Sequence, residues 1–132
     1  MKTTRLILLS AVMAMLAFTP LTESTINWKT TDLVLGEVPQ HKPVPIEFSF
    51  TNSGNTPLLI TNVQAGCGCT SVNYSKNPVM PGTSSAVTAV FNAAVKGAFK
   101  KTVTVTSNAE AEPRTLTFSG TVVETETLNF AD

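Results

Sequence analysis

Apolar and polar side chains alternate along much of this sequence in short runs, a pattern with the period of a β-strand. The clearest run is residues 44–52, where the apolar positions are Val44, Ile46, Phe48 and Phe50. Residues two apart in a strand face the same side, so this run predicts a strand with one buried face. No long segment repeats its apolar residues at helical spacing. We therefore expect an all-β protein.

Seven runs of this kind are separated by turn signals, at a spacing of about 12–17 residues. They cover Asp32–Val38, Val44–Asn52, Leu58–Gln64, Thr70–Tyr74, Ser84–Phe91, Phe99–Ser107 and Thr115–Val123. Between two of them lies Pro81-Gly82, a pair that suits the central positions of a type II turn. The pattern predicts an immunoglobulin-like β-sandwich of about seven antiparallel strands. An eight-stranded barrel is the alternative, and it fits the chain length less well.

The N-terminal segment, residues 1–24, is typical of a secretory signal peptide. Lys2 and Arg5 precede an apolar run that covers residues 6–18. This run is shorter than the roughly 20 residues that span a bilayer, so a transmembrane anchor is the less favoured alternative. We expect the segment to be removed and the protein to be secreted or periplasmic in a bacterial cell envelope. No stable membrane span is expected after cleavage.

The rest of the chain has the size of one domain, which we place at residues 31–123, followed by a polar tail at residues 124–132. Nine basic and nine acidic residues become seven and eight when Lys2, Arg5 and Glu23 leave with the signal peptide. A net charge of about −1 offers no electrostatic footprint for nucleic acid. Charged residues are only 14% of the chain, and this low fraction favours a surface that a protein partner covers in part.

Both cysteines of the chain lie in the stretch Gly66-Cys67-Gly68-Cys69-Thr70. In an extended strand the Cα atoms of residues i and i+2 are about 6.5–7 Å apart, at or beyond the usual limit for a disulfide. A kink at Gly68 would shorten this distance. A disulfide across so short a loop would be easily reduced and would stabilise the fold little. It would therefore suit redox chemistry better than a structural role.

Two other interpretations of Cys67 and Cys69 stay open. A pair of thiolates binds a soft cation such as copper(I), whereas zinc prefers four ligands. The weak further candidates for such a site are His41 and Met80, and His41 lies in a polar connection typical of a solvated side chain. Alternatively, both cysteines are small packing residues whose glycine neighbours allow a close approach. No cofactor is expected unless the soft-metal interpretation holds.

The remaining residues do not assemble a catalytic motif. A single histidine leaves no basis for a Ser/His/Asp set, the acidic residues are scattered, and no glycine-rich phosphate loop is present. The pair Lys100-Lys101 is expected to be an ordinary solvated strand face. We expect a non-enzymatic module that binds another envelope or secreted protein or supports a larger assembly. A thiol-redox or soft-metal protein using the Cys-Gly-Cys motif is the alternative.

The order of several short motifs resembles a known family. They are Phe50-Thr51-Asn52-Ser53-Gly54, Leu59–Val63, Cys67-Gly68-Cys69-Thr70, Pro81-Gly82, Gly97–Asn108 and Leu116–Val122. Together they resemble the domain of unknown function 1573 (DUF1573) family of exported bacterial proteins, over residues 31–123. The Cys-Gly-Cys-Thr element and the Pro-Gly pair are the specific parts of the match. The resemblance implies an immunoglobulin-like fold and export, and it carries no established activity.

Overall fold

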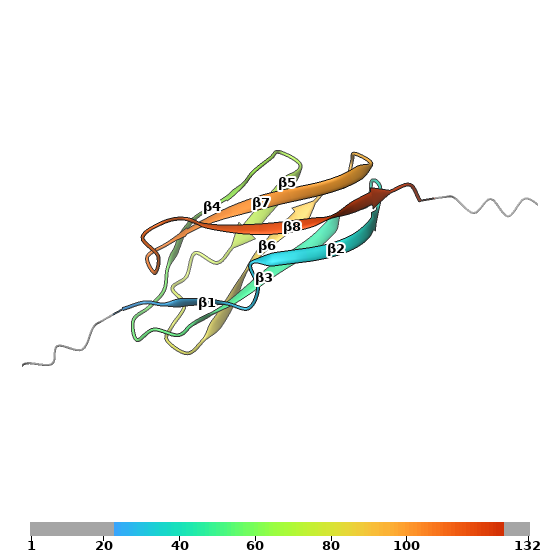
Figure 1. Ribbon diagram of the computed structural model, residues 1–132. Helices are drawn as coiled ribbons and strands as arrows, with labels where there is room; N and C mark the ends of the chain where they lie inside the picture. The colour runs from blue at the N-terminus through green and yellow to red at the C-terminus, as the bar shows by residue number, and fades with distance from the viewer. Residues whose placement is uncertain (1–22, 126–132) are drawn as a thin grey trace, which may run out of the picture.

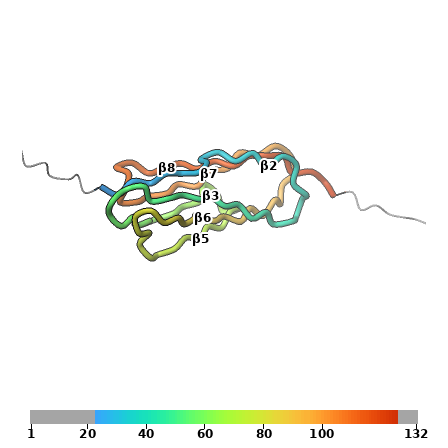
Figure 2. Tube along the Cα trace, turned by 90° about the horizontal axis from the view of Figure 1, so that it is seen from below, coloured from blue at the N-terminus to red at the C-terminus, as the bar shows by residue number. Residues whose placement is uncertain are grey.

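The computed structural model describes residues 23–125, which form two four-stranded sheets packed face to face (Figures 1 and 2). The strands are β1 (Ile26–Trp28), β2 (Asp32–Pro39), β3 (Val44–Asn52), β4 (Ile60–Ala65), β5 (Thr70–Tyr74), β6 (Ser84–Phe91), β7 (Gly97–Ser107) and β8 (Arg114–Val123). One sheet has the order β1-β3-β6-β5 and the other β2-β8-β7-β4. Figure 2 separates the layers, with β2, β7 and β8 in one and β3, β5 and β6 in the other.

Apolar side chains on the facing sides of the two sheets form the core, among them Ile46, Phe48 and Phe50 of the run predicted to have one buried face. The largest fully buried ones are Phe48, Phe50, Phe118, Leu58, Leu116, Val87, Val103, Val105 and Val122. The rings of Phe91, Phe99 and Phe118 are also in contact, with centroids 4.5–6.2 Å apart. Each such side chain contributes about 1.5–3 kcal/mol when it leaves water. The burial of these alternating apolar side chains is thus the main source of the fold's stability.

The expected all-β, immunoglobulin-like sandwich is confirmed, with some differences in its strands. The structure adds β1, which pairs with the end of β3 from Ile26 opposite Asn52 to Trp28 opposite Phe50. A strand of three residues is too short to show alternation, so the sequence carried no signal for it. Leu58 forms an isolated bridge with Val79 rather than starting a strand. The strands are also not all antiparallel, because β2 runs parallel to β8.

The predicted Pro81-Gly82 turn has the expected geometry. At Pro81-Gly82, Gly82 has φ 78° and the Thr83 amide donates to the Met80 carbonyl at 3.1 Å, which is the expected type II turn.

The predicted signal peptide and C-terminal tail lie outside the described residues, except for residues 23–24 and 124–125. Among residues 23–125, no helix is long and apolar enough to cross a membrane.

Asn52, at the end of β3, is a fully buried polar residue that joins two loops. Its Nδ2 donates to the carbonyls of Thr56 at 2.8 Å and Val79 at 2.9 Å, and its Oδ1 accepts from the Gly54 amide at 3.0 Å. Buried backbone groups need such partners because water cannot reach them. The sequence predicted a turn after Asn52, but not that this side chain would satisfy the backbone of its own turn and of the segment before β6.

β2 lies against β8 with an irregularity that depends on two glycines. The β2–β8 register shifts between Val34 and Glu37, where Gly36 has φ 71°. A Cβ atom built on Gly120 of β8 would lie 2.5 Å from the Gly36 carbonyl oxygen and 3.0 Å from the Phe99 ring. Only glycine at position 120 therefore lets the bulged strand and the aromatic ring approach β8 together.

Candidate functional site

The two cysteines lie in the connection between β4 and β5, where the chain crosses from one sheet to the other. We call residues 66–70 the Cys turn. Cys67 and Cys69 are joined by a disulfide, with their Cα atoms 5.3 Å apart, and both are half-buried. A turn at Gly68 brings the two residues within disulfide reach. It does so without a positive φ, since the positive-φ glycines among the described residues are Gly36, Gly82 and Gly97.

Backbone hydrogen bonds hold the Cys turn against both sheets. The Gly66 amide donates to the Thr102 carbonyl of β7 at 2.9 Å, and the Asn92 amide donates to the Cys69 carbonyl at 3.0 Å. A Cβ atom on Gly66 would lie 2.6 Å from the Thr102 Oγ1, whereas one on Gly68 would have nothing within 4 Å. The first glycine therefore permits a close approach, and the second permits only the turn.

The weak metal candidates do not join the cysteines. Met80 precedes β6 and is 55% exposed. The Cys turn lies beside Phe91 at the other end of β6, and the eight residues of this strand span about 25 Å. His41 is an exposed turn residue between β2 and β3 whose amide donates to the Ala93 carbonyl at 2.9 Å. In residues 23–125 no group of three or more His, Cys, Asp or Glu side chains is placed to hold a metal ion.

His41 has φ 61°, a left-handed backbone conformation. Histidine tolerates left-handed backbone better than most residues, and β-branched residues tolerate it worst. We expect His41→Gly to change the free energy of unfolding by less than about 0.5 kcal/mol, and His41→Val to lower it by about 1–2 kcal/mol. Urea unfolding of the two variants measures this difference. Equal stabilities would show that backbone conformation does not select the residue.

The disulfide closes a loop of only three residues, so its contribution to stability is expected to be small. The loop-entropy relation gives about 1.5 kcal/mol for such a ring, roughly half of the value for a 15-residue loop. We expect a Cys67→Ser, Cys69→Ser variant to keep the fold and to lose no more than this amount. Urea unfolding of oxidised wild type and variant makes the comparison. A loss above about 3 kcal/mol would instead identify the disulfide as a principal staple of the fold.

A groove of about 240 Å³ adjoins the Cys turn, between it and the loop that joins β6 to β7. Its lining is apolar at Cys69, Phe91, Val95 and Phe99 and basic at Lys96, Lys100 and Lys101. Val95 is 80% exposed, and no acidic residue of the described chain lines the groove. The two adjacent lysines were expected to form only an ordinary solvated face. The sequence places three lysines around Phe99, and this spacing is the signal that could have indicated a basic groove.

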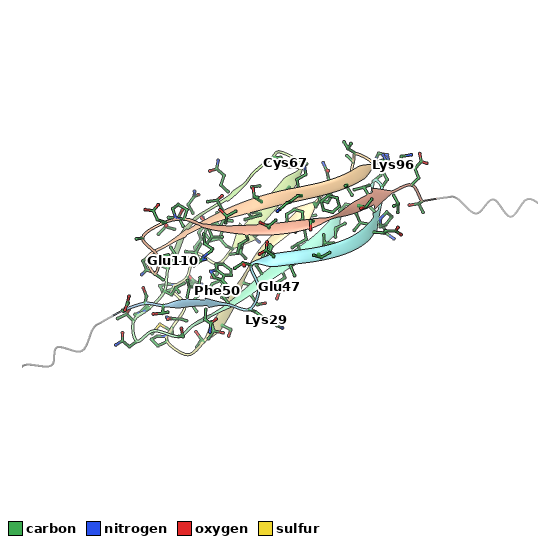
Figure 3. All side chains as sticks on the ribbon, in the orientation of Figure 1. Lys29, Glu47, Phe50, Cys67, Lys96 and Glu110 are labelled. Atoms are coloured by element: carbon green, nitrogen blue, oxygen red, sulfur yellow. A yellow bond between two sulfur atoms is a disulfide. The ribbon has the colours of Figure 1, made fainter. Side chains whose placement is uncertain are left out.

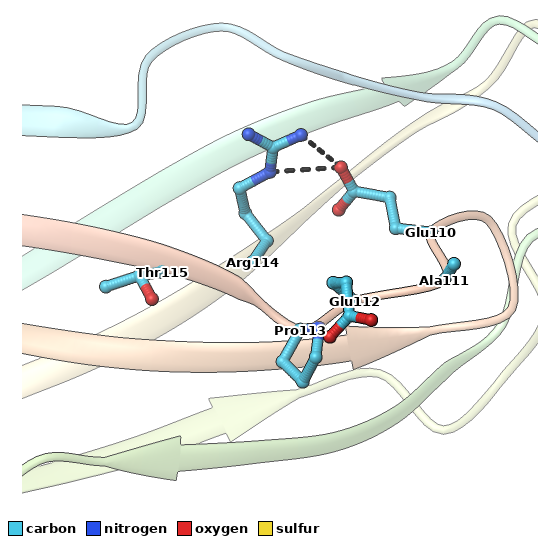
Figure 4. Close-up of a pocket in the computed structure, with 6 residues that line it drawn as sticks. All are labelled: Glu110, Ala111, Glu112, Pro113, Arg114 and Thr115. Carbon is cyan, nitrogen blue, oxygen red and sulfur yellow. Dashed lines mark hydrogen bonds and ion pairs between the residues drawn. The ribbon is translucent and has the colours of Figure 1, made fainter.

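A wider hollow of about 560 Å³ lies at the turn between β7 and β8 (Figure 4). There, Arg114 donates through Nε to the Glu110 Oε1 at 3.0 Å and forms an ion pair with the same carboxylate. This hydrogen bond and the negative charge of Glu110 raise the pKa of Arg114 above its ordinary value. Because the Arg114 guanidinium is already paired with the Glu110 carboxylate, this hollow is a weaker candidate for anion binding than the lysine-lined groove.

Comparison with solved structures supports the same fold. A protein of unknown function from Porphyromonas gingivalis W83 matches with a TM-score of 0.67 and 14% identity, over 80% of this chain and 50% of that one. The ASH/PapD-like domain 7 of human CEP192 matches with a TM-score of 0.65 and 10% identity, over 89% and 98%. The secreted serine protease VesC from Vibrio cholerae matches with a TM-score of 0.55 and 15% identity, over 77% and 23%.

These identities are low, so the likeness concerns the fold alone. The chain spans about half of the P. gingivalis protein and less than a quarter of the protease, but nearly the whole of the human domain. No curated protein matches the sequence. The family model described as "Protein of unknown function (DUF1573)" matches residues 26–122, which include every strand except the last residue of β8. The chain therefore belongs to the DUF1573 family.

Proposed function

We propose that this protein is an exported, non-catalytic immunoglobulin-like module that binds another protein in the bacterial cell envelope or supports an assembly there. The observation that carries the proposal is the set of sheet edges that no other strand of residues 23–125 covers. β1 and β5 border one sheet, and β2 and β4 border the other. Each edge presents backbone donors and acceptors that an added strand can pair with.

Two further features support export and binding. The apolar leader at residues 1–24 has the length and charge pattern of a signal peptide. A disulfide between Cys67 and Cys69 fits an oxidising compartment such as the periplasm. At β2, Val34 is 82% exposed on an edge strand, a position where an apolar side chain gains from being covered by a partner.

Site-specific photo-crosslinking in cells tests the proposal. A photoreactive residue would replace Val34 on the β2 edge, Asn73 on the β5 edge or Lys100, which lies in β7 beyond the end of the pairing with β4, with Thr104 on an outward sheet face as the control. We expect at least one edge position, but not the control, to crosslink to a defined envelope protein identified by mass spectrometry. The proposal fails if none of the edge positions yields a specific adduct and the purified protein stays monomeric.

Thiol-disulfide exchange at the Cys turn is the second candidate function, favoured by the half-buried disulfide itself. A partner's dithiol would supply two electrons and two protons, opening the Cys67–Cys69 bond to two thiols while the partner becomes a disulfide. The soft-metal alternative would need these reduced thiols first. Mass spectrometry of the exported protein, with and without reductant and alkylation, decides between these states. A disulfide that stays closed in cells under every growth condition would exclude exchange.

A further inference from the structure

β7 is longer than the strand that covers its outer edge. β4 pairs with β7 only as far as Ala65 opposite Val103, followed by the hydrogen bond from Gly66 to Thr102. The Cys turn then carries the chain away into the other sheet. On its other side, β7 stays paired with β8 back to Gly97. Figure 1 shows β7 continuing past this turn, and Figure 3 labels Cys67 and Lys96 near the two ends of the uncovered stretch.

The backbone of residues 97–101, which we call the open edge of β7, is oriented for pairing. Successive residues of a strand direct their N–H and C=O groups to opposite sides. The Thr102 carbonyl faces β4, and the β7–β8 register has no shift from Gly97 to Val105. Ala98 and Lys100 therefore direct their N–H and C=O groups to the uncovered side, beyond the end of β4. These two donors and two acceptors suit one short added strand.

The groove beside the open edge defines which strand would fit. Side chains of an added strand alternate between the two faces of the sheet, as those of β7 do. On the inner face they would meet the apolar lining formed by Cys69, Phe91 and Phe99. On the outer face they would lie beside Lys100, which is exposed. The inner positions therefore suit apolar side chains, and the outer positions suit acidic ones.

Two of the three lysines at this site have no ion-pair partner in residues 23–125. Lys96 forms a 3.2 Å ion pair with Glu124, but the described part of the chain gives Lys100 and Lys101 no carboxylate partner. Lysines on a strand edge also disfavour pairing with an identical basic edge. A second copy of this edge is thus a poorer occupant than an acidic strand.

We propose that the open edge of β7 binds an extended segment of a partner protein, in which apolar and acidic residues alternate, as an added strand next to the end of β4. This inference rests on the proposed function, because it names the surface through which the module would bind. The backbone of Ala98 and Lys100 would hold the segment in place. The apolar groove would select the inner side chains of the segment, and the charge of Lys100 would select its outer ones, while Lys101, on the inner face beside Phe99, adds positive charge at the end of the groove.

A peptide titration followed by NMR tests this site. The probe is a capped peptide of seven residues that alternates glutamate with valine or leucine. One control peptide has lysine in place of each glutamate, and a second carries N-methyl groups on alternate amides to block pairing. We expect the acidic peptide to shift the amide signals of Ala98 and Lys100 and to slow their hydrogen exchange. The two control peptides should bind at least about tenfold more weakly.

Protein variants separate the backbone contribution from the charge contribution. Ala98→Pro removes one donor on the open side without removing a β7–β8 ladder bond, and we expect it to weaken binding by about fivefold. Lys100→Glu with Lys101→Glu should weaken binding by about tenfold or more. The matched control, Lys29→Glu with Lys42→Glu, makes the same charge change elsewhere and should stay within about twofold. Thermal unfolding of each variant confirms that the fold is retained.

The possible results distinguish the site from the general function. Equal binding of the acidic and basic peptides would overturn the proposed charge selection. Signal shifts on the β2 or β5 edge, with none on β7, would overturn the site while leaving a strand-binding module. If the wild-type protein binds no acidic peptide while a Lys100→Thr, Lys101→Thr variant aggregates, the lysines only protect the edge, and this also overturns the site. Loss of both peptide binding and every cellular crosslink would remove the proposed function as well.

Discussion

Replacing Asn52 with leucine is expected to lower the free energy of unfolding by about 3 kcal/mol. Leucine has a similar size but cannot bond to the backbone. The Gly54 amide and the Thr56 carbonyl then lose their partners, while the Val79 carbonyl keeps its hydrogen bond from Leu58. Two part-buried polar groups thus lose their partners, each at a cost of about 1–3 kcal/mol, and the buried Val79 carbonyl keeps only one of its two hydrogen bonds. Urea unfolding monitored by the fluorescence of the single tryptophan measures the change.

Asn108 provides the matched control for this prediction. Its Oδ1 accepts from the Leu59 amide at 2.9 Å and its Nδ2 donates to the Pro57 carbonyl at 3.2 Å, but the residue is exposed. Water can replace both bonds, so Asn108→Leu should cost about 1 kcal/mol or less. If the two leucine variants were equally destabilised, burial would not be the reason for the importance of Asn52.

Replacing Gly120 with alanine is expected to cost about 2 kcal/mol. The added methyl group would lie 2.5 Å from the Gly36 carbonyl oxygen and within 3.2 Å of the Phe99 ring. β2 must therefore move away from β8, and the Phe99 ring must shift within the core where it packs against Phe91. Urea unfolding gives the total cost, and hydrogen exchange along β2 shows whether the edge strand loosens first.

Gly68→Ala serves as the control for this glycine. A Cβ atom added to Gly68 would meet no other atom within 4 Å, and the residue has no positive φ, so alanine fits there without strain. Its effect should lie between zero and a stabilisation of about 1 kcal/mol, because alanine restricts the unfolded chain. A Gly120→Ala variant as stable as Gly68→Ala would mean that β2 adjusts freely to the methyl group.

Local periodicity was enough to predict most of the core. Phe48, Phe50, Leu116 and Phe118 are buried as their alternation predicts, because a half-buried strand needs only its own sequence to define an inner face. Features that depend on distant pairing were not predictable in this way. The parallel contact of β2 with β8 and the addition of β1 to β3 follow from long-range register, which leaves no mark in a short window of sequence.

The candidate site was likewise predictable in its local geometry but not in its long-range contacts. Simple geometry correctly required a turn at Gly68 before Cys67 and Cys69 could be joined. It could not show that this turn ends β4 before β7 is fully covered, because strand lengths in a sheet are set by both partners. Lys100 therefore looked like any solvated lysine in the sequence. Its proposed role depends on two features of the folded chain, the uncovered edge of β7 and the adjoining groove.

The parallel pair of β2 and β8 has a mechanical consequence. The described chain enters at one end of the sandwich and leaves at the opposite end (Figure 1). Tension between residues 23 and 125 would therefore act along β2 and β8, from Asp32 opposite Thr117 to Pro39 opposite Val123. Their hydrogen bonds would be sheared together rather than opened one at a time. The fold is thus arranged to resist stretching along its long axis.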